Sequence, residues 1–262
     1  METSVEIGNA PRGNGLRGQA DFLLDFADTL MAAGTQTSRV VRNVERLADN
    51  FGCRADIIIL PRTIIMTVSS GNFSLTRVKK VSPHAPDFRI ISELRILSWE
   101  AYKNGMPLDE CKKRFDEIKK QKPVSWKIKA PIVALGNAAF CQLFGGFYSV
   151  PLVFFTTLAG WLARFALQRR RAPEQLCCIV AAFVSSLLAG IGANIFGFKT
   201  DIAISTSILY LVPGVPLLNA FIDMFDGHIL AGFSRLVKAS ETILAMTLGL
   251  LGAILILGRA IL

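Results

Sequence analysis

The sequence contains little that would support metal-dependent or hydrolytic chemistry. It has only two histidines, His84 and His228, and its five cysteines include no C-x-x-C pair. A structural zinc site takes four such ligands at close spacing, so we expect no metal site. The sequence also lacks an H-E-x-x-H motif and a G-x-S-x-G elbow. It therefore predicts no catalytic residue and no cofactor, and the chain is not expected to be an enzyme.

A hydrolytic triad can still be imagined from Ser38, Asp223 and His228. Such triads are recognised by the geometry of three side chains, whatever their order in the chain. Ser38 belongs to the charged half of the sequence and the other two to the apolar half. We therefore do not expect these three residues to act together.

Charged residues are scarce in the second half of the chain. Residues 130–262 hold 8 Lys and Arg with 5 Asp and Glu, whereas residues 1–129 hold 21 and 15. The mean hydropathy of the chain is +0.44. These values exclude a single soluble domain, a disordered chain and a secreted disulfide scaffold. The N-terminus has no basic segment followed by an apolar run, so we do not expect a cleaved signal peptide.

The charged half predicts a small α+β domain at 19–128, preceded by a tail at 1–18 that is rich in Gly, Pro and Asn. Helical spacing and β-branched runs alternate within this domain. The helical segments are 21–30, 41–51, 90–104 and 108–121, and the expected strands are 56–60, 63–68 and 73–78. The lysines around residue 112 fit a solvated helix face or contact with anionic lipid head groups. No aromatic interleaving accompanies them, so we expect no nucleic-acid partner.

The apolar half, 129–262, contains five stretches that approach the 20 or so residues needed to cross a bilayer. They lie near 130–147, 149–168, 175–196, 202–222 and 240–261. We therefore expect an α-helical polytopic membrane protein with five transmembrane helices and an N-terminal cytoplasmic α+β domain. Eight Lys and Arg flank one side of these stretches and two flank the other. This asymmetry predicts a multi-pass protein with its N-terminal domain in the cytoplasm and its C-terminus outside.

The third stretch carries small residues at every fourth position. They are Ala181, Ser185, Ala189, Ala193 and Gly197. Such a ridge lets another helix approach closely, and a pore lining is the alternative interpretation.

The fourth stretch holds Pro213, Gly214 and Pro216 near its middle. Each proline removes an N–H and obstructs the preceding turn, so the helix should break there. A break at bilayer depth is tolerated only where protein or a water-filled cavity covers the exposed backbone. The half-helix that follows would offer N–H groups to an anion such as a carboxylate substrate. A kink that serves packing alone is the alternative.

Asn219 and Asp223 follow Pro216 on the same helical stripe. Asp223 would carry a proton, form a gate with Arg235, or be a helix-end carboxylate in water. His228 would titrate near neutral pH or be a surface residue. Asp226 lies between them in the chain and completes the candidates for gating or proton coupling.

These motifs resemble the signature of the threonine/serine exporter (ThrE) family. The resemblance rests on residues 212–219, 223–228 and 232–235, together with 34–38 and 76–78 of the charged half. It implies a protein of the bacterial inner membrane that exports small carboxylates or amino acids from the cytoplasm. Members that work as one chain have more spans than this sequence provides. The resemblance therefore also implies a smaller membrane protein as partner, in a complex of higher order.

From this resemblance we expect an exporter subunit for succinate-like dicarboxylates. A subunit that exports threonine and serine is the alternative, and a membrane scaffold or sensor without transport is the second alternative. The expected substrate pathway is formed by Pro213, Gly214, Pro216, Asn219 and Asp223. The expected gate or proton-coupling residues are Asp226, His228 and Arg235.

Overall fold

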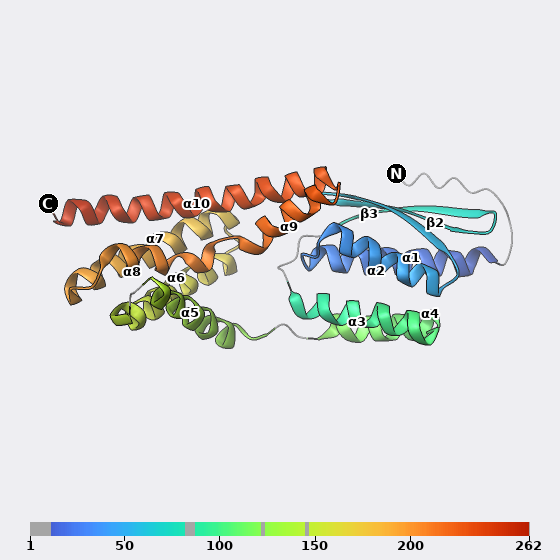
Figure 1. Ribbon diagram of the computed structural model, residues 1–262, viewed down its shortest axis with the longest axis horizontal. Helices are drawn as coiled ribbons and strands as arrows, with labels where there is room; N and C mark the ends of the chain where they lie inside the picture. Colours follow the sequence, from blue (N-terminus) through green and yellow to red (C-terminus); the bar gives the residue numbers. More distant parts are fainter. Residues whose placement is uncertain (1–11, 82–86, 122–123, 145–146, 262) are drawn as a thin grey trace. The chain divides into compact units, whose positions relative to one another are not determined.

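The computed structural model describes residues 12–81, 87–121, 124–144 and 147–261 (Figure 1). His84 and the first eleven residues of the expected tail lie outside these ranges. The chain forms two compact units. The first unit comprises Met1–Lys122 and Leu218–Leu236, and the second unit comprises Pro123–Leu217 and Val237–Leu262. A segment of the apolar half therefore belongs to the same unit as the charged half, which the expected boundary near residue 129 did not foresee.

The first unit combines helices with a three-stranded sheet. Its elements are α1 (Arg12–Ala32), α2 (Thr37–Asn50), β1 (Arg54–Leu60), β2 (Thr63–Ser70), β3 (Phe73–Lys80), α3 (Phe88–Asn104) and α4 (Leu108–Lys120). Helices α1 and α2 lie between the sheet on one side and α3 with α4 on the other (Figure 1). The main apolar core of the unit forms between these layers.

The sheet is antiparallel with the order β1-β2-β3. Pairing of Leu60 with Thr63 closes a tight turn at Pro61, and pairing of Ser70 with Phe73 closes the next turn at Gly71. Side chains alternate along β2, and Ile64, Met66 and Val68 are fully buried. The three strands that the β-branched runs predict are confirmed.

Helix α1 begins at Arg12, so residues 12–18 are helical and the prediction of a tail over them was wrong. Glycines at 15 and 18 lower helix propensity, which is why the sequence favoured a loose segment. Burial outweighs this cost, because Leu16 and Ala20 belong to the core of the first unit.

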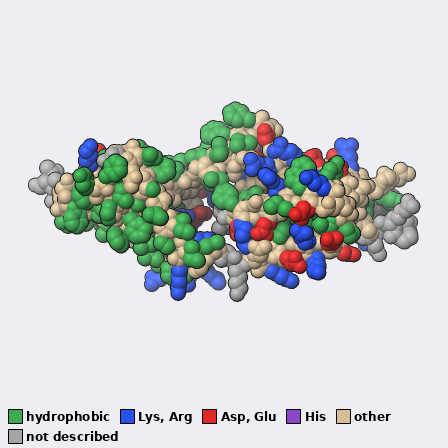
Figure 2. Space-filling view, turned by 60° about the horizontal axis from the view of Figure 1, so that its bottom comes forward, with side chains coloured by type: hydrophobic (Ala, Val, Ile, Leu, Met, Phe, Trp, Pro, Cys, Tyr) green, Lys and Arg blue, Asp and Glu red, His purple; other side chains and the backbone are tan. Residues whose placement is uncertain are grey.

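The second unit is made of helices. Its elements are α5 (Trp126–Leu143), η1 (Phe147–Ser149), α6 (Val150–Arg169), α7 (Glu174–Phe196), α8 (Thr200–Ser207) and η2 (Leu209–Leu211), with parts of α9 (Gly214–Phe225) and α10 (Ile229–Ile261). Hydrophobic side chains cover most of its visible surface, whereas charged side chains gather over α1 to α4 (Figure 2).

Among the described residues, three helices are long and apolar enough to cross a membrane, by length and composition. They are Phe147–Arg169, Glu174–Phe196 and Ile229–Gly258. The bent pair Thr200–Leu211 and Gly214–Phe225 makes a fourth if it is one span. Helix α5, where we expected the first span, is not among these candidates in the described part of the chain. Two lysines in its first turn lower its hydropathy.

The small-residue ridge of α7 packs inside the second unit. Ala181, Ser185, Ala189 and Ala193 are all fully buried. Gly160 of α6 lies so close to α7 that an added Cβ would be 2.8 Å from the carbonyl oxygen of Ala181. The ridge therefore allows the close helix approach that its spacing predicts.

Candidate functional site

The fourth apolar stretch is broken where its prolines predict. Helix α8 ends at Ser207, and α9 begins at Gly214 after the short turn η2. The two halves are bent by 59°. Pro213 and Pro216 explain the break, because each lacks the N–H that would continue the helical ladder.

The start of α9 offers fewer backbone donors than we expected. The Gly214 N–H donates to the carbonyl oxygen of Val212 at 2.9 Å, and the Leu217 N–H donates to that of Pro213 at 3.0 Å. Pro216 has no N–H. Among the described residues, this leaves the Val215 N–H as the one donor of the first turn without a partner. The second proline thus breaks the helix but also shortens the row of donors that an anion would need.

The carbonyl groups at the end of α8 are satisfied by a side chain from α5. The Asn137 amide nitrogen donates to the carbonyl oxygens of Thr206 at 2.8 Å and Ser207 at 3.3 Å, and to the Thr157 hydroxyl at 2.7 Å. Asn137 is 6% exposed. This Asn137 cluster explains how the break is tolerated in an apolar unit, since its free carbonyls are paired inside the protein.

A second polar contact holds the same turn at Tyr210. The hydroxyls of Tyr210 and Ser185 are 3.2 Å apart, and the Ser185 hydroxyl donates to the carbonyl oxygen of Thr156 at 3.3 Å. Gly160 leaves room for both hydroxyls, because its added Cβ would lie 2.5 Å from the Tyr210 oxygen. The Ser185 side chain of α7, bonded to the backbone of α6, therefore holds η2 as Asn137 holds the end of α8.

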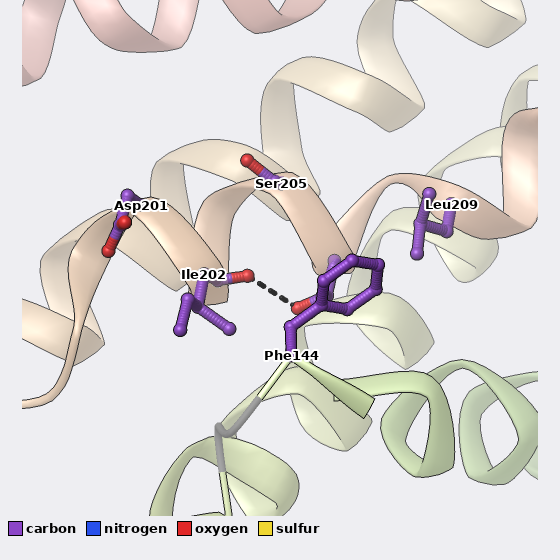
Figure 3. A pocket seen from close by; sticks show the side chains of 6 residues that line it. Phe144, Asp201, Ile202, Ser205 and Leu209 are labelled. Atoms are coloured by element: carbon purple, nitrogen blue, oxygen red, sulfur yellow. Dashed lines mark hydrogen bonds between the residues drawn. The ribbon is translucent and has the colours of Figure 1, made fainter. Parts of the chain in front are cut away.

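A cavity of about 290 Å³ lies beside α8, lined by Phe144, Asp201, Ile202, Ser205, Thr206 and Leu209. Figure 3 shows the hydrogen bond from the Thr206 hydroxyl to the carbonyl oxygen of Ile202, which is 2.6 Å long. The charged group of this lining is the carboxylate of Asp201, and the lining includes no cationic side chain. A dianion would be repelled there, so we do not assign the cavity to a carboxylate.

Asp223 of α9 is joined to the loop between α1 and α2. Its carboxylate accepts hydrogen bonds from the Thr37 N–H at 2.8 Å and the Thr37 hydroxyl at 3.0 Å. The same carboxylate pairs with the Arg235 Nε at 3.1 Å, and Asp223 is fully buried. Because Thr37 begins α2, the carboxylate also lies at the positive end of that helix dipole. This buried charge is therefore fully partnered, and it is not a helix-end carboxylate in water.

Two further residues hold the same loop. The Asn219 amide donates to the carbonyl oxygen of Gly34 at 3.0 Å and accepts from the Gln36 amide at 3.1 Å. The Arg235 guanidinium donates to the carbonyl oxygen of Thr35 at 2.7 Å. All these groups belong to the first unit. We call the set formed by Gly34–Thr37, Asn219, Asp223 and Arg235 the Asp223 joint.

The joint also supplies the cap at the start of α2. Gln36 occupies the N-cap position without a side-chain hydrogen bond. Asp223 takes over this function from a distant part of the chain, since it accepts the Thr37 N–H. The hydroxyls of Thr35 and Ser38 are buried without a partner among the described residues.

The structure brings together three of the predicted site residues, Asn219, Asp223 and Arg235. Asp226 and His228 lie in the turn between α9 and α10, and the His228 N–H donates to the carbonyl oxygen of Asp223 at 2.8 Å. In the described ranges, the side chains of Asp226 and His228 make no hydrogen bond or ion pair with the joint. Gly227 has φ of +87°, which suits the helix end that this turn requires.

Sequence reasoning missed the groups that complete both clusters. Asn137 carried a signal, because an amide within an apolar stretch needs a partner inside the protein. Gln36 and Thr37 gave none, because 183 and 186 residues separate them from Asn219 and Asp223. No spacing rule of one sequence relates such distant positions.

No group of three or more His, Cys, Asp and Glu side chains that could hold a metal ion occurs in the part of the chain that the structure describes. The five cysteines are free and buried. Burial raises the pKa of Cys111 to about 11, and the neighbouring Glu110 adds to this effect. A thiol with such a pKa is a poor nucleophile at neutral pH, so Cys111 serves the core of the first unit.

Comparison with known proteins places the chain in a transport family. The family model described as "Putative threonine/serine exporter" (ThrE) matches residues 21–257. The chain is 29% identical over 233 residues to "Probable succinate transporter subunit YjjP" of Klebsiella aerogenes, covering 87% of this chain and 90% of that protein. It is 28% identical to the protein of the same name from Escherichia coli (strain K12), covering 87% and 91%.

No solved structure matches the chain. The family match covers far more than half of the sequence and includes both the α1–α2 loop and the α9–α10 segment. These findings point to a transport protein rather than an enzyme, and the apolar helices agree with a membrane protein. The chain therefore belongs to the ThrE family of exporters.

Proposed function

We propose that the chain is one subunit of an exporter for succinate-like dicarboxylates in the bacterial inner membrane. The two relatives are named as succinate transporter subunits, which supports the substrate class and a partner protein. We take this partner to be a smaller, YjjB-type membrane protein in a hetero-oligomer. Threonine and serine export is the second candidate, because the family model carries that description.

In the proposed topology the N-terminal domain is cytoplasmic, the chain crosses the membrane five times and the C-terminus is outside. This arrangement needs α5 as the first span. Its 18 residues would extend about 27 Å, close to the thickness of a bilayer core. Arg169, Arg170 and Arg171 after α6 support a cytoplasmic position for that helix end.

The observation that carries the proposal is the Asp223 joint, located on the helix that follows the break. Pro213, Gly214 and Pro216 would act as a hinge in the substrate pathway, while Asn219 and Asp223 fasten the α1–α2 loop. The Arg235 guanidinium is engaged by Asp223 and by the carbonyl oxygen of Thr35. A substrate carboxylate can reach this guanidinium only after the loop has moved away, so substrate and Asp223 would compete for one cation.

One feature of the loop that the joint holds supports a gate that opens. The buried hydroxyls of Thr35 and Ser38 lack partners among the described residues, and such groups cost stability. A loop selected for stability alone would pair them. Asp226 and His228 would act from the adjoining turn between α9 and α10.

Export is tested by measuring intracellular and medium succinate and threonine in cells that lack or overproduce the chain together with its partner. Deletion should raise the intracellular succinate pool, and overproduction should raise succinate in the medium. A change in threonine instead would favour the second candidate. If neither pool changes, both candidates fail.

The hinge is tested by the double variant Pro213→Ala, Pro216→Ala. Restoring both N–H groups should straighten the segment, so export should be lost while the amount of protein in the membrane stays normal. Pro151→Ala in the first turn of α6 is the matched control, because proline is dispensable there. Normal export by the double variant would leave the break with a packing role only.

A further inference from the structure

Helices α2 and α3 share an outward face that the Asp223 joint does not use. Its basic residues are Arg39, Arg42 and Arg46 of α2 and Arg95 of α3, and its aromatic residues are Trp99 and Tyr102 of α3. We call these six residues the α2–α3 face. The three arginines of α2 follow each other at steps of three and four, so they form one ridge of that helix.

Among the described residues, none of the four arginines of this face lies in an ion pair with a carboxylate. The acids of α3 have other partners, since Glu100 pairs with Arg114 at 2.8 Å and Glu93 accepts from Gln121 at 2.7 Å. Glu45 and Asp49 of α2 are exposed beside the arginine ridge, and they leave the four arginines in excess. Burial, followed by the charges of Arg42 and Arg95, lowers the pKa of Arg46. The face therefore accumulates positive charge that an external anion would stabilise.

The aromatic residues of the face are held in place and remain open to solvent. The Arg46 guanidinium lies 3.7 Å from the centre of the Trp99 ring and donates to the Ser98 hydroxyl at 2.8 Å. Trp99 is 43% exposed and Tyr102 is 51% exposed. On the same stripe, Ile96 and Phe88 are 47% and 60% exposed. The face thus combines fixed cations with a row of unburied apolar surface.

We propose that the α2–α3 face docks on the surface of an anionic lipid bilayer. Guanidinium groups bind lipid phosphates, and Trp and Tyr rings favour the head-group level of a membrane. A bilayer is within reach, because the same chain carries helices that are long and apolar enough to cross one. Because the face and the membrane helices belong to one chain, the lipid surface is present at a high effective concentration. Weak contacts are then enough for docking.

Helix α4, which carries the lysines that the sequence suggested as lipid contacts, has five Lys and Arg with four Asp and Glu. Helix α2 has three Arg with two acids, so net charge alone does not distinguish the two helices. The α2–α3 face differs by its exposed rings, Trp99 and Tyr102, whereas Phe115 of α4 is buried. This inference concerns lipid alone, and it holds whichever substrate the exporter carries.

The test uses the full-length chain in lipid nanodiscs, with Trp99 as the reporter. Trp126→Phe and Trp161→Phe leave Trp99 as the single tryptophan, and both changes keep an aromatic ring beside Phe165. Brominated lipids quench a tryptophan that touches the bilayer. We expect strong quenching of Trp99 in discs that contain phosphatidylglycerol, weak quenching in neutral discs, and loss of the effect at high salt.

Arg39→Gln, Arg42→Gln and Arg95→Gln should lower the docking equilibrium about five-fold for each arginine removed. Lys113→Gln, Lys119→Gln and Lys120→Gln on α4 remove the same charge and should leave the quenching unchanged. Three results would overturn the proposal. They are equal quenching in neutral and anionic discs, no response to the three arginine changes, and protection of Trp99 that requires an added partner protein.

Discussion

The two buried polar clusters of the molecule solve different problems. The Asn137 cluster in the second unit uses only neutral groups and pairs the carbonyls that a broken helix leaves free. The Asp223 joint in the first unit uses a carboxylate and a guanidinium, and it holds segments that lie about 185 residues apart in the chain. One cluster completes a local backbone ladder, whereas the other fastens a distant loop.

This difference indicates which of the two clusters can open at a lower cost in free energy. Hydrogen bonds from a neutral amide to backbone carbonyls bury no charge, so the Asn137 cluster suits a contact that stays formed. A buried ion pair is weak evidence for stability, since both ions lose their hydration. In the proposed gate such a pair would have two states, because either ion could exchange its partner for water, for a loop or for a charged substrate.

The largest expected effect comes from breaking the charged joint. Asp223→Asn leaves the partly buried Arg235 guanidinium without its carboxylate and weakens both contacts to Thr37. We expect the free energy of unfolding, measured by denaturant titration in detergent micelles, to fall by about 3–5 kcal/mol. Adding Arg235→Gln should recover part of this loss, because it removes the unpaired charge.

Asp226→Asn is the matched control for this prediction. The same chemical change occurs three residues further along, at an exposed carboxylate for which the described structure gives no partner. Its effect should stay within about 0.5 kcal/mol. Equal losses for the two variants would mean that the joint contributes no more than a surface carboxylate does.

A smaller effect is expected from the neutral cluster. Asn137→Ala removes the donor to the carbonyl oxygens of Thr206 and Ser207, which then stay unpaired in an apolar unit. Hydrogen bonds between membrane helices contribute about 0.6–2 kcal/mol, and we expect a loss in this range. Asn194→Ala on α7 is the control, because that side chain is exposed. The comparison of the two clusters fails if Asn137→Ala is as costly as Asp223→Asn.

The periodicity of the sequence was sufficient to predict most helices and strands. It was not sufficient to predict which segments assemble into the first unit. The strand runs and the proline break were predictable, since both depend on the residue types of one short segment. Residues 218–236 were assigned to the apolar half because their composition is apolar, yet they belong to the first unit. Their polar exceptions, Asn219, Asp223 and Arg235, are the groups that join them to it. The composition of residues 218–236 is an average over the whole segment, whereas their place in the first unit depends on a few polar side chains.

The candidate site was predictable in its residues but not in its partners. The sequence named Arg235 as one possible partner of Asp223, and the structure places them 3.1 Å apart. It did not indicate that Thr37 supplies two more hydrogen bonds. The expected row of backbone donors at α9 also failed, because Pro216 removes one donor and Leu217 finds its own acceptor. Proline identity shows where a helix breaks, while the use of the remaining N–H groups depends on the turn that forms.

The smallest expected effect concerns an ion pair of the first unit that water reaches. The Lys79 ammonium of β3 donates a hydrogen bond to the carboxylate of Asp25 in α1, and its Nζ lies 3.0 Å from Oδ2 of Asp28. Burial alone would lower the pKa of Lys79, but the hydrogen bonds and charges of the two carboxylates outweigh it and raise the pKa.

A raised pKa means that the stabilisation is complete below the ordinary lysine pKa and is lost as the pH rises through the folded value. The stability difference between the wild type and Lys79→Gln should therefore be constant from pH 7 to about pH 9.5 and shrink above about pH 10.5. Denaturant titrations of both proteins across this range measure it, and titrating groups that the two share cancel in the difference. A gap that stays constant through about pH 11 would mean that Lys79 gains nothing from its carboxylates, and a gap that widens with pH would mean that the cost of burial outweighs them.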